Sequence, residues 1–265
     1  MTQKKLKIGI IGIGMVGGAV KNWFQKQKYP LSLYDKYKKI GSIEEVDKAD
    51  VVFICVSTPY HKRSGYDDSA VLESLKNLTG KKVVVIKSTI LPGSTEKFQE
   101  KFPQYKILFN PEFLVAKTAV KNFLNPKRQV VGFTKKSKNV ARKILDILPK
   151  APYQEIIPSP EAEMVKYFGN AFLSTKVIFA NQIYDLCKKL GIDYDIVKTI
   201  ASYDPRIGSS HLGVSHDGYR GYGGACFPKD MKSLLQLARN KKVNLKLLIA
   251  ADEINEGLIK HRRKK

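Results

Sequence analysis

The densest group of chemically capable residues is the run Gly221-Tyr222-Gly223-Gly224-Ala225-Cys226-Phe227-Pro228-Lys229-Asp230. Its glycines let the backbone approach a ligand without an intervening Cβ atom. Cys226 is a potential nucleophile, and the helix-like segment 231–239 and Lys229 both lower a thiol pKa from its usual value of about 8.5. Asp230 can act as an acid or a base, or hold a neighbouring group. The run therefore indicates a nucleophile loop, although from spacing alone a glycine-rich loop with a helix cap and a buried cysteine explains it equally well.

Length and composition describe a globular chain that can bury a core. The 265 residues are enough for two domains, and no low-complexity tract or internal repeat interrupts them. Three scattered cysteines do not form a disulfide framework, which favours a reducing cytoplasm. Lysines precede the apolar run 8–20 as in a signal peptide, but that run is glycine-rich and fits a strand and nucleotide loop better. Because no apolar stretch reaches transmembrane length, we expect a soluble cytoplasmic protein without a membrane partner.

The formal net charge of +23 admits two kinds of partner. Clustered lysine and arginine would indicate a nucleic acid, since they displace phosphate counterions. The excess is mostly lysine spread along the whole chain, and no nucleic-acid-binding motif accompanies it. A positive field also attracts dinucleotides and nucleotide sugars. We therefore expect an anionic small molecule rather than a nucleic acid, and a solvated terminus at 260–265.

The first half of the chain opens with a dinucleotide-binding pattern. A buried strand is predicted at 6–11, followed by Gly12-Ile13-Gly14-Met15-Val16-Gly17, a helix over 20–28 and a second strand over 31–34 that ends at Asp35. The glycines permit a tight turn, close approach of a pyrophosphate, and packing of helix on strand. The pattern is informative because its strand and helix stand where the motif requires them.

Asp35 distinguishes between two cofactors. An acidic residue about 20 positions after the glycine loop suits the ribose hydroxyls of NAD and repels the 2′-phosphate of NADP. Three lysines follow it and keep NADP as an alternative: Lys36, Lys38 and Lys39. We predict NAD.

Strands and helices then alternate. The predicted strands are 51–56, 83–86, 106–109 and 130–133, and the helices between them are 69–78 and 94–101. This alternation predicts an α/β fold with a Rossmann-type, doubly wound parallel sheet, whose ligands bind at the carboxyl ends of the strands. Ser57-Thr58, Ser88-Thr89 and Asn110-Pro111-Glu112 stand at those ends. Singly each could be a cap or a turn, but together they favour a site.

The second half begins at the break Pro158–Pro160 and continues as a long helix over 161–190. Its apolar residues recur every three to five positions, which is typical of a core or dimer contact. Lys166 and Asn170 share one face of this helix, where taken alone they indicate a snorkelling lysine and a mid-helix amide. Further helices are predicted at 193–201, 231–239 and 245–259. We therefore assign residues 1–157 to an NAD-binding domain and residues 158–265 to an all-helical central, dimerisation domain.

Several of these runs together resemble the UDP-glucose/GDP-mannose dehydrogenase family, over roughly residues 7–255. The resemblance rests on the nucleophile run, the glycine loop with Asp35, and the runs Ser57-Thr58-Pro59, Lys87-Ser88-Thr89-Ile90-Leu91-Pro92-Gly93, Asn110-Pro111-Glu112-Phe113-Leu114 and Arg206-Ile207-Gly208, and on Glu163, Lys166, Asn170, Ala171, Phe172 and Leu173. Family members usually carry a third, nucleotide-sugar-binding domain, which we expect this sequence to lack.

The resemblance implies roles for individual residues. Cys226 is then the catalytic cysteine, Thr89 holds the catalytic water, and Glu112 assists acyl transfer and hydrolysis. Lys166 and Asn170 hold the reacting hydroxyl and the oxyanion. Arg206 reaches the substrate from the other subunit of a homodimer that forms through the long helix. The catalytic set is completed by Asp230.

Two binding sets follow in the same way. The cofactor set is Gly12, Gly14, Met15, Val16, Gly17, Asp35, Ser57, Thr58, Thr89 and Lys229. The substrate set is Phe113, Leu114, Lys166, Asn170, Arg206, Tyr222 and Gly223. The two loop histidines, His211 and His216, lack metal-ligand spacing, and no metal is predicted. Ala116 stands where the family usually has a second glutamate.

The reaction implied is oxidation of the C6 alcohol of UDP-glucose to UDP-glucuronate with two molecules of NAD. Cys226 would form a thiohemiacetal and then a thioester, which water hydrolyses. A GDP-mannose or UDP-N-acetylhexosamine dehydrogenase would share the same motifs. A non-catalytic relic, or a nucleic-acid-binding protein that kept the fold, is the remaining alternative.

Overall fold

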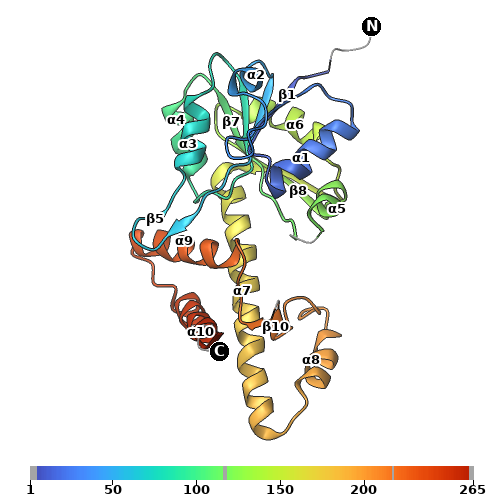
Figure 1. Ribbon diagram of the computed structural model, residues 1–265, viewed down its shortest axis with the longest axis vertical. Helices are drawn as coiled ribbons and strands as arrows, with labels where there is room; N and C mark the ends of the chain where they lie inside the picture. The colour runs from blue at the N-terminus through green and yellow to red at the C-terminus, as the bar shows by residue number, and fades with distance from the viewer. Residues whose placement is uncertain (1–4, 116–117, 217, 263–265) are drawn as a thin grey trace. The chain divides into compact units, whose positions relative to one another are not determined.

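The chain folds into two compact units, Met1–Lys166 and Tyr167–Lys265. The computed structural model in Figure 1 describes residues 5–115, 118–216 and 218–262. Within those ranges no helix is both long and apolar enough to cross a membrane. The domain division after residue 157 stays a prediction, and the two units are described separately below.

A seven-stranded sheet forms the centre of the first unit, in the order β2-β1-β3-β6-β7-β8-β9. Its strands are β1 (Ile8–Ile11), β2 (Leu31–Tyr34), β3 (Val51–Ile54), β6 (Val83–Ile86), β7 (Lys106–Phe109), β8 (Arg128–Phe133) and β9 (Tyr153–Pro158). Pairing from β2 through β7 is parallel, which confirms the doubly wound α/β prediction. The sheet is not parallel throughout, because β8 runs antiparallel to β7, and β9 pairs in parallel with β8.

Helices cover both faces of this sheet. They are α1 (Met15–Lys26), α2 (Ile43–Asp47), α3 (Ser69–Lys76), α4 (Ser94–Lys101), α5 (Ala119–Leu124), α6 (Lys138–Ile147) and the first turns of α7 (Ser159–Leu190). Figure 1 shows α3 and α4 on one side of the sheet and α1, α5 and α6 on the other. Alternate residues of β6 enter the two cores, Val84 on the α3 side and Val85 on the α1 side. Strands buried on both faces read as continuous apolar runs, which is why their positions were predictable.

Several features of the first unit were not predicted, among them the helices α2, α5 and α6. A two-stranded hairpin joins β4 (Tyr60–His61) to β5 (Gly65–Tyr66). Strand β9 leads into Pro158–Pro160, where the sequence predicted a break between the two halves and no strand. Pro158 ends this edge strand and Pro160 lies in the first turn of α7, where a proline needs no backbone N–H bond.

A carboxylate from α7 caps the buried start of α4. Gly93 occupies the N-cap position with φ +89° and has no side chain to offer. Glu163 supplies the missing acceptors: Oε2 accepts from the Gly93 N–H at 2.5 Å and Oε1 accepts from the Thr95 N–H at 2.8 Å. The Thr95 hydroxyl donates to the same Oε1 at 2.5 Å. Glu163 therefore satisfies N–H groups that a helix start leaves unbonded, and it fixes α7 to α4.

The second unit is predominantly helical. It holds the remainder of α7 with α8 (Tyr194–Ser202), α9 (Phe227–Asn240) and α10 (Lys246–Arg262). It also contains an antiparallel hairpin of β10 (Ser215–His216) and β11 (Tyr219–Arg220), so it is not helical throughout. Helix α9 begins four residues before the predicted 231, because Pro228 fits the first turn of a helix.

The Glu163 cap predicts a pH-dependent stability. Burial raises the pKa of Glu163 to about 7 against an ordinary value of 4.5. The folded state therefore binds more protons than the unfolded state between these values, and stability present below pH 4.5 is lost as the pH rises to about 7. Between these pH values we expect the wild-type free energy of unfolding to fall by about 3 kcal/mol relative to Glu163→Gln.

Urea denaturation of both proteins across this pH range checks the expectation. Glu161→Gln changes an exposed carboxylate at the start of the same helix and serves as the control. The prediction would be contradicted if the free energy of unfolding changed with pH by the same amount in wild type and in Glu163→Gln.

Candidate active site

A cavity of about 540 Å³ in the first unit lies against the glycine loop and the carboxyl ends of β1, β2 and β3. Four of the predicted cofactor residues line it: Gly12, Gly14, Asp35 and Ser57. The others have different positions. Met15 is exposed, Val16 is half-buried and Gly17 is buried under the loop. Thr58 is buried and donates to the Thr89 carbonyl at 2.7 Å, so that it joins two loops at this edge of the sheet.

The three glycines of the loop serve different purposes. A Cβ atom at Gly17 would collide with the Gly12 carbonyl oxygen, and one at Gly12 would lie 2.8 Å from the Cys55 carbonyl oxygen. A Cβ atom at Gly14 would meet nothing within 4 Å. Gly12 and Gly17 are therefore required by packing, whereas Gly14 leaves open a space at the start of α1. That uncovered helix start fits the pyrophosphate of a dinucleotide.

Asp35 and its neighbouring lysines favour NAD over NADP. Asp35 is buried and accepts from the backbone N–H groups of Ile13 at 2.8 Å and Lys38 at 2.9 Å. Burial raises the pKa of Asp35, but these bonds outweigh it and hold the pKa below its ordinary value. The Lys38 ammonium donates to the Ile13 carbonyl at 2.7 Å, and Lys36 pairs with Glu73 at 3.1 Å. The cavity thus presents an ionised carboxylate, and both lysines are already bonded.

Glu112 and Lys166 form a buried ion pair in the first unit. Lys166 Nζ lies 2.6 Å from Glu112 Oε1, and the Leu114 N–H donates to Oε2 at 2.7 Å. Burial raises the pKa of Glu112, but the Lys166 charge and hydrogen bond outweigh it, so the pKa lies below its ordinary value. Glu112 is therefore a carboxylate at neutral pH, with both oxygens held in place. Thr89 lies half-buried at the end of β6, on the neighbouring loop.

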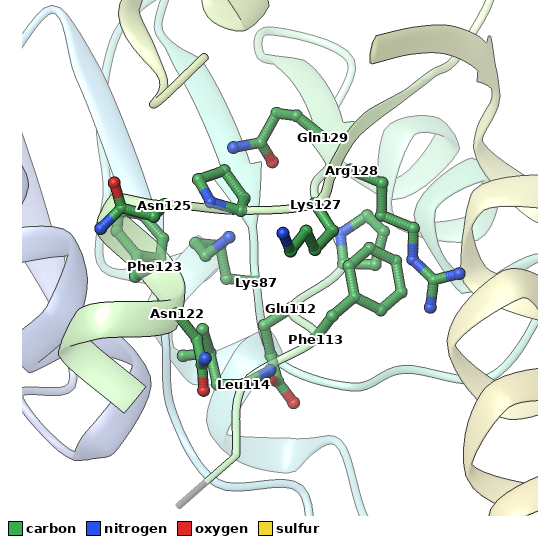
Figure 2. Close-up of a pocket in the computed structure, with 12 residues that line it drawn as sticks. Lys87, Glu112, Phe113, Leu114, Asn122, Phe123, Asn125, Lys127, Arg128 and Gln129 are labelled. Carbon is green, nitrogen blue, oxygen red and sulfur yellow. Dashed lines mark hydrogen bonds between the residues drawn. The ribbon is translucent and has the colours of Figure 1, made fainter. Parts of the chain in front are cut away.

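A second cavity of the first unit, about 260 Å³ in volume, adjoins Glu112 (Figure 2). Phe113 and Leu114, both predicted to contact substrate, line it. The Arg128 guanidinium lies 3.8 Å from the centre of the Phe113 ring, and Figure 2 shows the two side chains against each other. Lys87, a residue to which the sequence gave no role, also lines this cavity. A charged residue directly after the apolar strand Val83–Ile86 was the signal that could have identified it.

The predicted nucleophile stands at the start of a helix in the second unit. Cys226 is half-buried and occupies the N-cap position of α9. The Asp230 carboxylate is buried in the first turn, where Oδ2 accepts from Asn170 Nδ2 at 2.5 Å and Oδ1 from Lys229 Nζ at 2.5 Å. The structure thus brings together Asn170, Lys229 and Asp230, all three of which were predicted to be site residues.

The glycine run before Cys226 is packed against α10. Gly221 has φ +82°, and a Cβ atom there would collide with the Asn255 side chain. The Tyr222 N–H donates to Asn255 Oδ1 at 2.8 Å, and the Tyr222 hydroxyl donates to Asp252 at 2.8 Å. Burial and the Asp252 carboxylate both raise the pKa of Tyr222. The Tyr222 side chain is therefore bonded within the unit, and a substrate contact from this loop would come from its backbone or from Gly223.

The remaining predicted site residues have no contact that tests their role. Arg206 is largely exposed, and its Nη2 lies 2.6 Å from Asp204 Oδ2. Ala116 lies outside the described residues. Across 5–115, 118–216 and 218–262, no three side chains of the metal-ligating types gather into a possible metal site, and the absence of a metal stays a prediction.

A parallel sheet with a glycine loop and a ligand-sized cavity at its carboxyl edge defines a dinucleotide-binding α/β protein. Comparison with known proteins specifies the class. Residues 160–257 match the UDP-glucose/GDP-mannose dehydrogenase family, central domain, and residues 34–148 match the NAD binding domain of the same family. The chain belongs to the UDP-glucose/GDP-mannose dehydrogenase family, and NAD is its cofactor.

Individual relatives agree with this assignment. A UDP-glucose 6-dehydrogenase from Rickettsia bellii is 34% identical over 223 residues, which cover 80% of this chain and 50% of the relative. A UDP-glucose 6-dehydrogenase from Bacillus subtilis is 35% identical over 222 residues, which cover 78% of this chain and 46% of the relative. The solved UDP-glucose dehydrogenase of Pyrobaculum islandicum has a TM-score of 0.85 at 26% identity and covers 95% of this chain and 68% of its own. The chain thus spans about half the length of the curated relatives that it matches.

Substitution of the loop glycines tests the cofactor cavity. Gly14→Ala adds a methyl group where the fold leaves space, so we expect an unchanged melting temperature and an NAD dissociation constant raised about tenfold or more, equal to about 1.4 kcal/mol. Calorimetric titration with NAD measures it. Gly18→Ala is the matched control, since its Cβ also meets nothing within 4 Å and Gly18 does not line the cavity. Wild-type NAD affinity in Gly14→Ala would rule out this cavity as the cofactor site.

Proposed function

We propose that this chain catalyses the NAD-dependent oxidation of the C6 alcohol of a nucleotide sugar, with UDP-glucose as substrate and UDP-glucuronate as product. The observation that carries the proposal is the burial of two hydrogen-bonded pairs of polar side chains. Glu112 bonds to Lys166, and Asp230 bonds to Asn170. Lys166 and Asn170 stand four residues apart on α7. Buried ionisable groups aligned in this way are typical of catalytic sites.

The residues suit the successive steps of such an oxidation. The glycine loop and Asp35 would hold NAD, which when bound supplies the acceptor for a hydride leaving C6. The Lys166 ammonium would donate a hydrogen bond to the reacting oxygen, and Asp230 would accept the hydroxyl proton through water. Cys226 would add its thiolate to the resulting aldehyde, forming a C–S bond and a thiohemiacetal alkoxide. Loss of a second hydride from that carbon, to a second molecule of NAD, would leave a thioester. Water then replaces the sulfur and releases the carboxylic acid and the thiol.

The start of α9 supports the role of Cys226. A thiolate at a helix N-terminus is stabilised by the positive end of the helix dipole. Lys229 adds a positive charge within the first turn, and it is anchored by Asp230. A thiol in these surroundings is favoured as a nucleophile over Cys55, whose pKa is raised to about 12 by burial. Asn170 and backbone N–H groups of the loop would stabilise the alkoxide.

Glu112 and Thr89 suit the hydrolysis step. Because the Glu112 pKa is held below its ordinary value, its carboxylate would orient the attacking water as a hydrogen-bond acceptor and take up its proton as the C–O bond forms. Thr89 would hold the same water from the neighbouring loop. Asp230 would accept a proton through water, a role that its bonds to Asn170 and Lys229 keep in position.

UDP-glucose is preferred over other nucleotide sugars on the basis of the relatives. Those of 34–35% identity bear the name UDP-glucose 6-dehydrogenase. A GDP-mannose or UDP-N-acetylhexosamine dehydrogenase would use the same residues, and a substrate panel distinguishes these activities. We propose the cytoplasm as the location, because three cysteines scattered along the chain do not form a disulfide framework, which favours a reducing compartment.

Turnover tests the proposed reaction. With NAD and limiting UDP-glucose, absorbance at 340 nm should show two NADH per sugar, with UDP-glucuronate formed. Cys226→Ser should lower acid formation by about 10³-fold or more, whereas Cys187→Ser, which changes a buried cysteine on α7, should retain it. Undiminished acid formation by Cys226→Ser would refute the covalent mechanism.

We also propose that the chain forms a homodimer through α7. Five large apolar side chains on this helix are more than half exposed: Phe168, Phe172, Phe179, Leu186 and Leu190. At about 100° per residue they fall within about 40° of arc, so they form one stripe. An apolar stripe of this length, exposed in a single copy, suits a second copy of the same helix. Arg206 would then reach the substrate of the partner.

Solution mass tests the dimer. Phe179→Glu places a charge in the middle of the stripe and should give a monomer at concentrations where the wild type is a dimer, as measured by light scattering. Lys188→Glu lies about half a turn from the stripe on the same helix and should remain dimeric. A wild-type mass equal to one chain at micromolar concentration would refute the homodimer.

A further inference from the structure

Lys87 is a buried ammonium in an apolar part of the sheet. It directly follows β6, its side chain is 2% exposed, and its Nζ lies 5.3 Å from the centre of the Phe123 ring. A buried charge is costly without hydrogen bonds or a counter-ion. Within the described part of the chain, no carboxylate forms an ion pair with Lys87; its Nζ donates to Asn110 Oδ1 at 2.6 Å and to the Asn110 carbonyl at 3.3 Å.

Asn110 is itself held by the strands beside it. Its Nδ2 donates to Gln129 Oε1 at 2.9 Å and to the Val130 carbonyl at 2.6 Å. Gln129 in turn donates to the Pro149 carbonyl at 3.3 Å. These buried bonds extend from the end of β6 across the end of β7 into β8. The Asn110 side chain is thereby fixed with its oxygen toward Lys87.

This bond joins two loops that carry proposed catalytic residues. Lys87 is separated from Thr89 by one residue, and Asn110 is separated from Glu112 by one residue. Lys87 and Glu112 line the same cavity, and Figure 2 shows the Lys87 amine directed into it. The Lys87 charge therefore acts on Glu112 in addition to the charge of Lys166.

We propose that Lys87 is a positioning residue for Glu112: its buried ammonium ties the Thr89 loop to the Glu112 loop and adds a positive charge near the Glu112 carboxylate, second to that of Lys166. The catalytic importance of this arrangement rests on the proposed function. The effect of Lys87 on Glu112 is a property of the folded chain, and it can be measured without turnover.

The groups that face Glu112 are few among the described residues. Lys166 approaches from α7, the Leu114 N–H from the same loop, and Lys87 from the end of β6. Two further groups act on Lys87 in turn: Cys55, at the end of β3, raises the Lys87 pKa, and the positive charge of Lys166 lowers it. Burial lowers the pKa of Lys87 to about 8, so it is protonated throughout the acid range in which Glu112 titrates.

The test is a ¹³C NMR titration of the glutamate carboxyl carbons in the full chain, with the Glu112 resonance assigned by Glu112→Gln. In Lys87→Met we expect the Glu112 pKa to be higher than in wild type by about 0.5 or more, since a nearby positive charge has been removed. Lys87→Arg retains that charge and should keep the wild-type value. Lys87→Gln keeps an amide donor for Asn110 without the charge, and it replaces Lys87→Met if that variant does not fold.

Gln129→Met is the matched control, because it breaks the same buried network beyond Asn110 and leaves the charge of Lys87 in place. A Glu112 pKa that is unchanged in the uncharged Lys87 variants, or raised equally in Gln129→Met, would overturn the proposal. The pH profile of NADH formation provides a separate readout: its acid limb should move with the NMR pKa in Lys87→Met. Absence of turnover in the wild type would refute the proposed function, whereas the NMR result would still decide the role of Lys87.

Discussion

Burial of ionisable side chains is the constraint on which the rest of this structure depends. A carboxylate or ammonium removed from water must find a partner inside the protein. Glu112 is paired with Lys166, Asp230 is held by Asn170, and Glu163 binds the backbone at the start of α4. In each case the partner comes from another element of the fold. The correct tertiary structure therefore supplies the hydrogen bonds that these buried groups need, and loss of one partner leaves the other buried and unsatisfied.

The same constraint orders the carboxyl edge of the sheet. Polar side chains there bond to neighbouring loops: the Thr58 hydroxyl donates to the Thr89 carbonyl at 2.7 Å, and the Ser88 hydroxyl donates to the Val56 carbonyl at 2.7 Å. The Lys87–Asn110 bond continues this pattern toward β8. Loops joined in this way lose little conformational freedom on binding, which favours a site already arranged for its ligands.

Helix starts offer positive potential in both units. Gly14 is the N-cap of helix α1, where the backbone is open to the cavity, and Cys226 is the N-cap of α9. N–H groups in the first turn of a helix have no intrahelical acceptor and favour anions. In the proposed reaction one helix start would bind the cofactor pyrophosphate and the other would stabilise a thiolate. One physical property of the helix thus serves both binding and chemistry.

The sequence by itself determined the positions of the strands of the seven-stranded sheet from β1 to β8, the glycine loop with Asp35, the long helix and the nucleophile run. These signals are local, since apolar periodicity and turn residues depend on neighbours in the chain. Tertiary structure decided strand β9, the reversal at β8, the Glu163 cap and the Lys87–Asn110 bond. Glu163 lies 68 residues from Thr95, and Lys87 lies 23 residues from Asn110. Contacts between such distant residues leave no periodic pattern, because each is formed by one pair of side chains that meet when the sheet and α7 assemble.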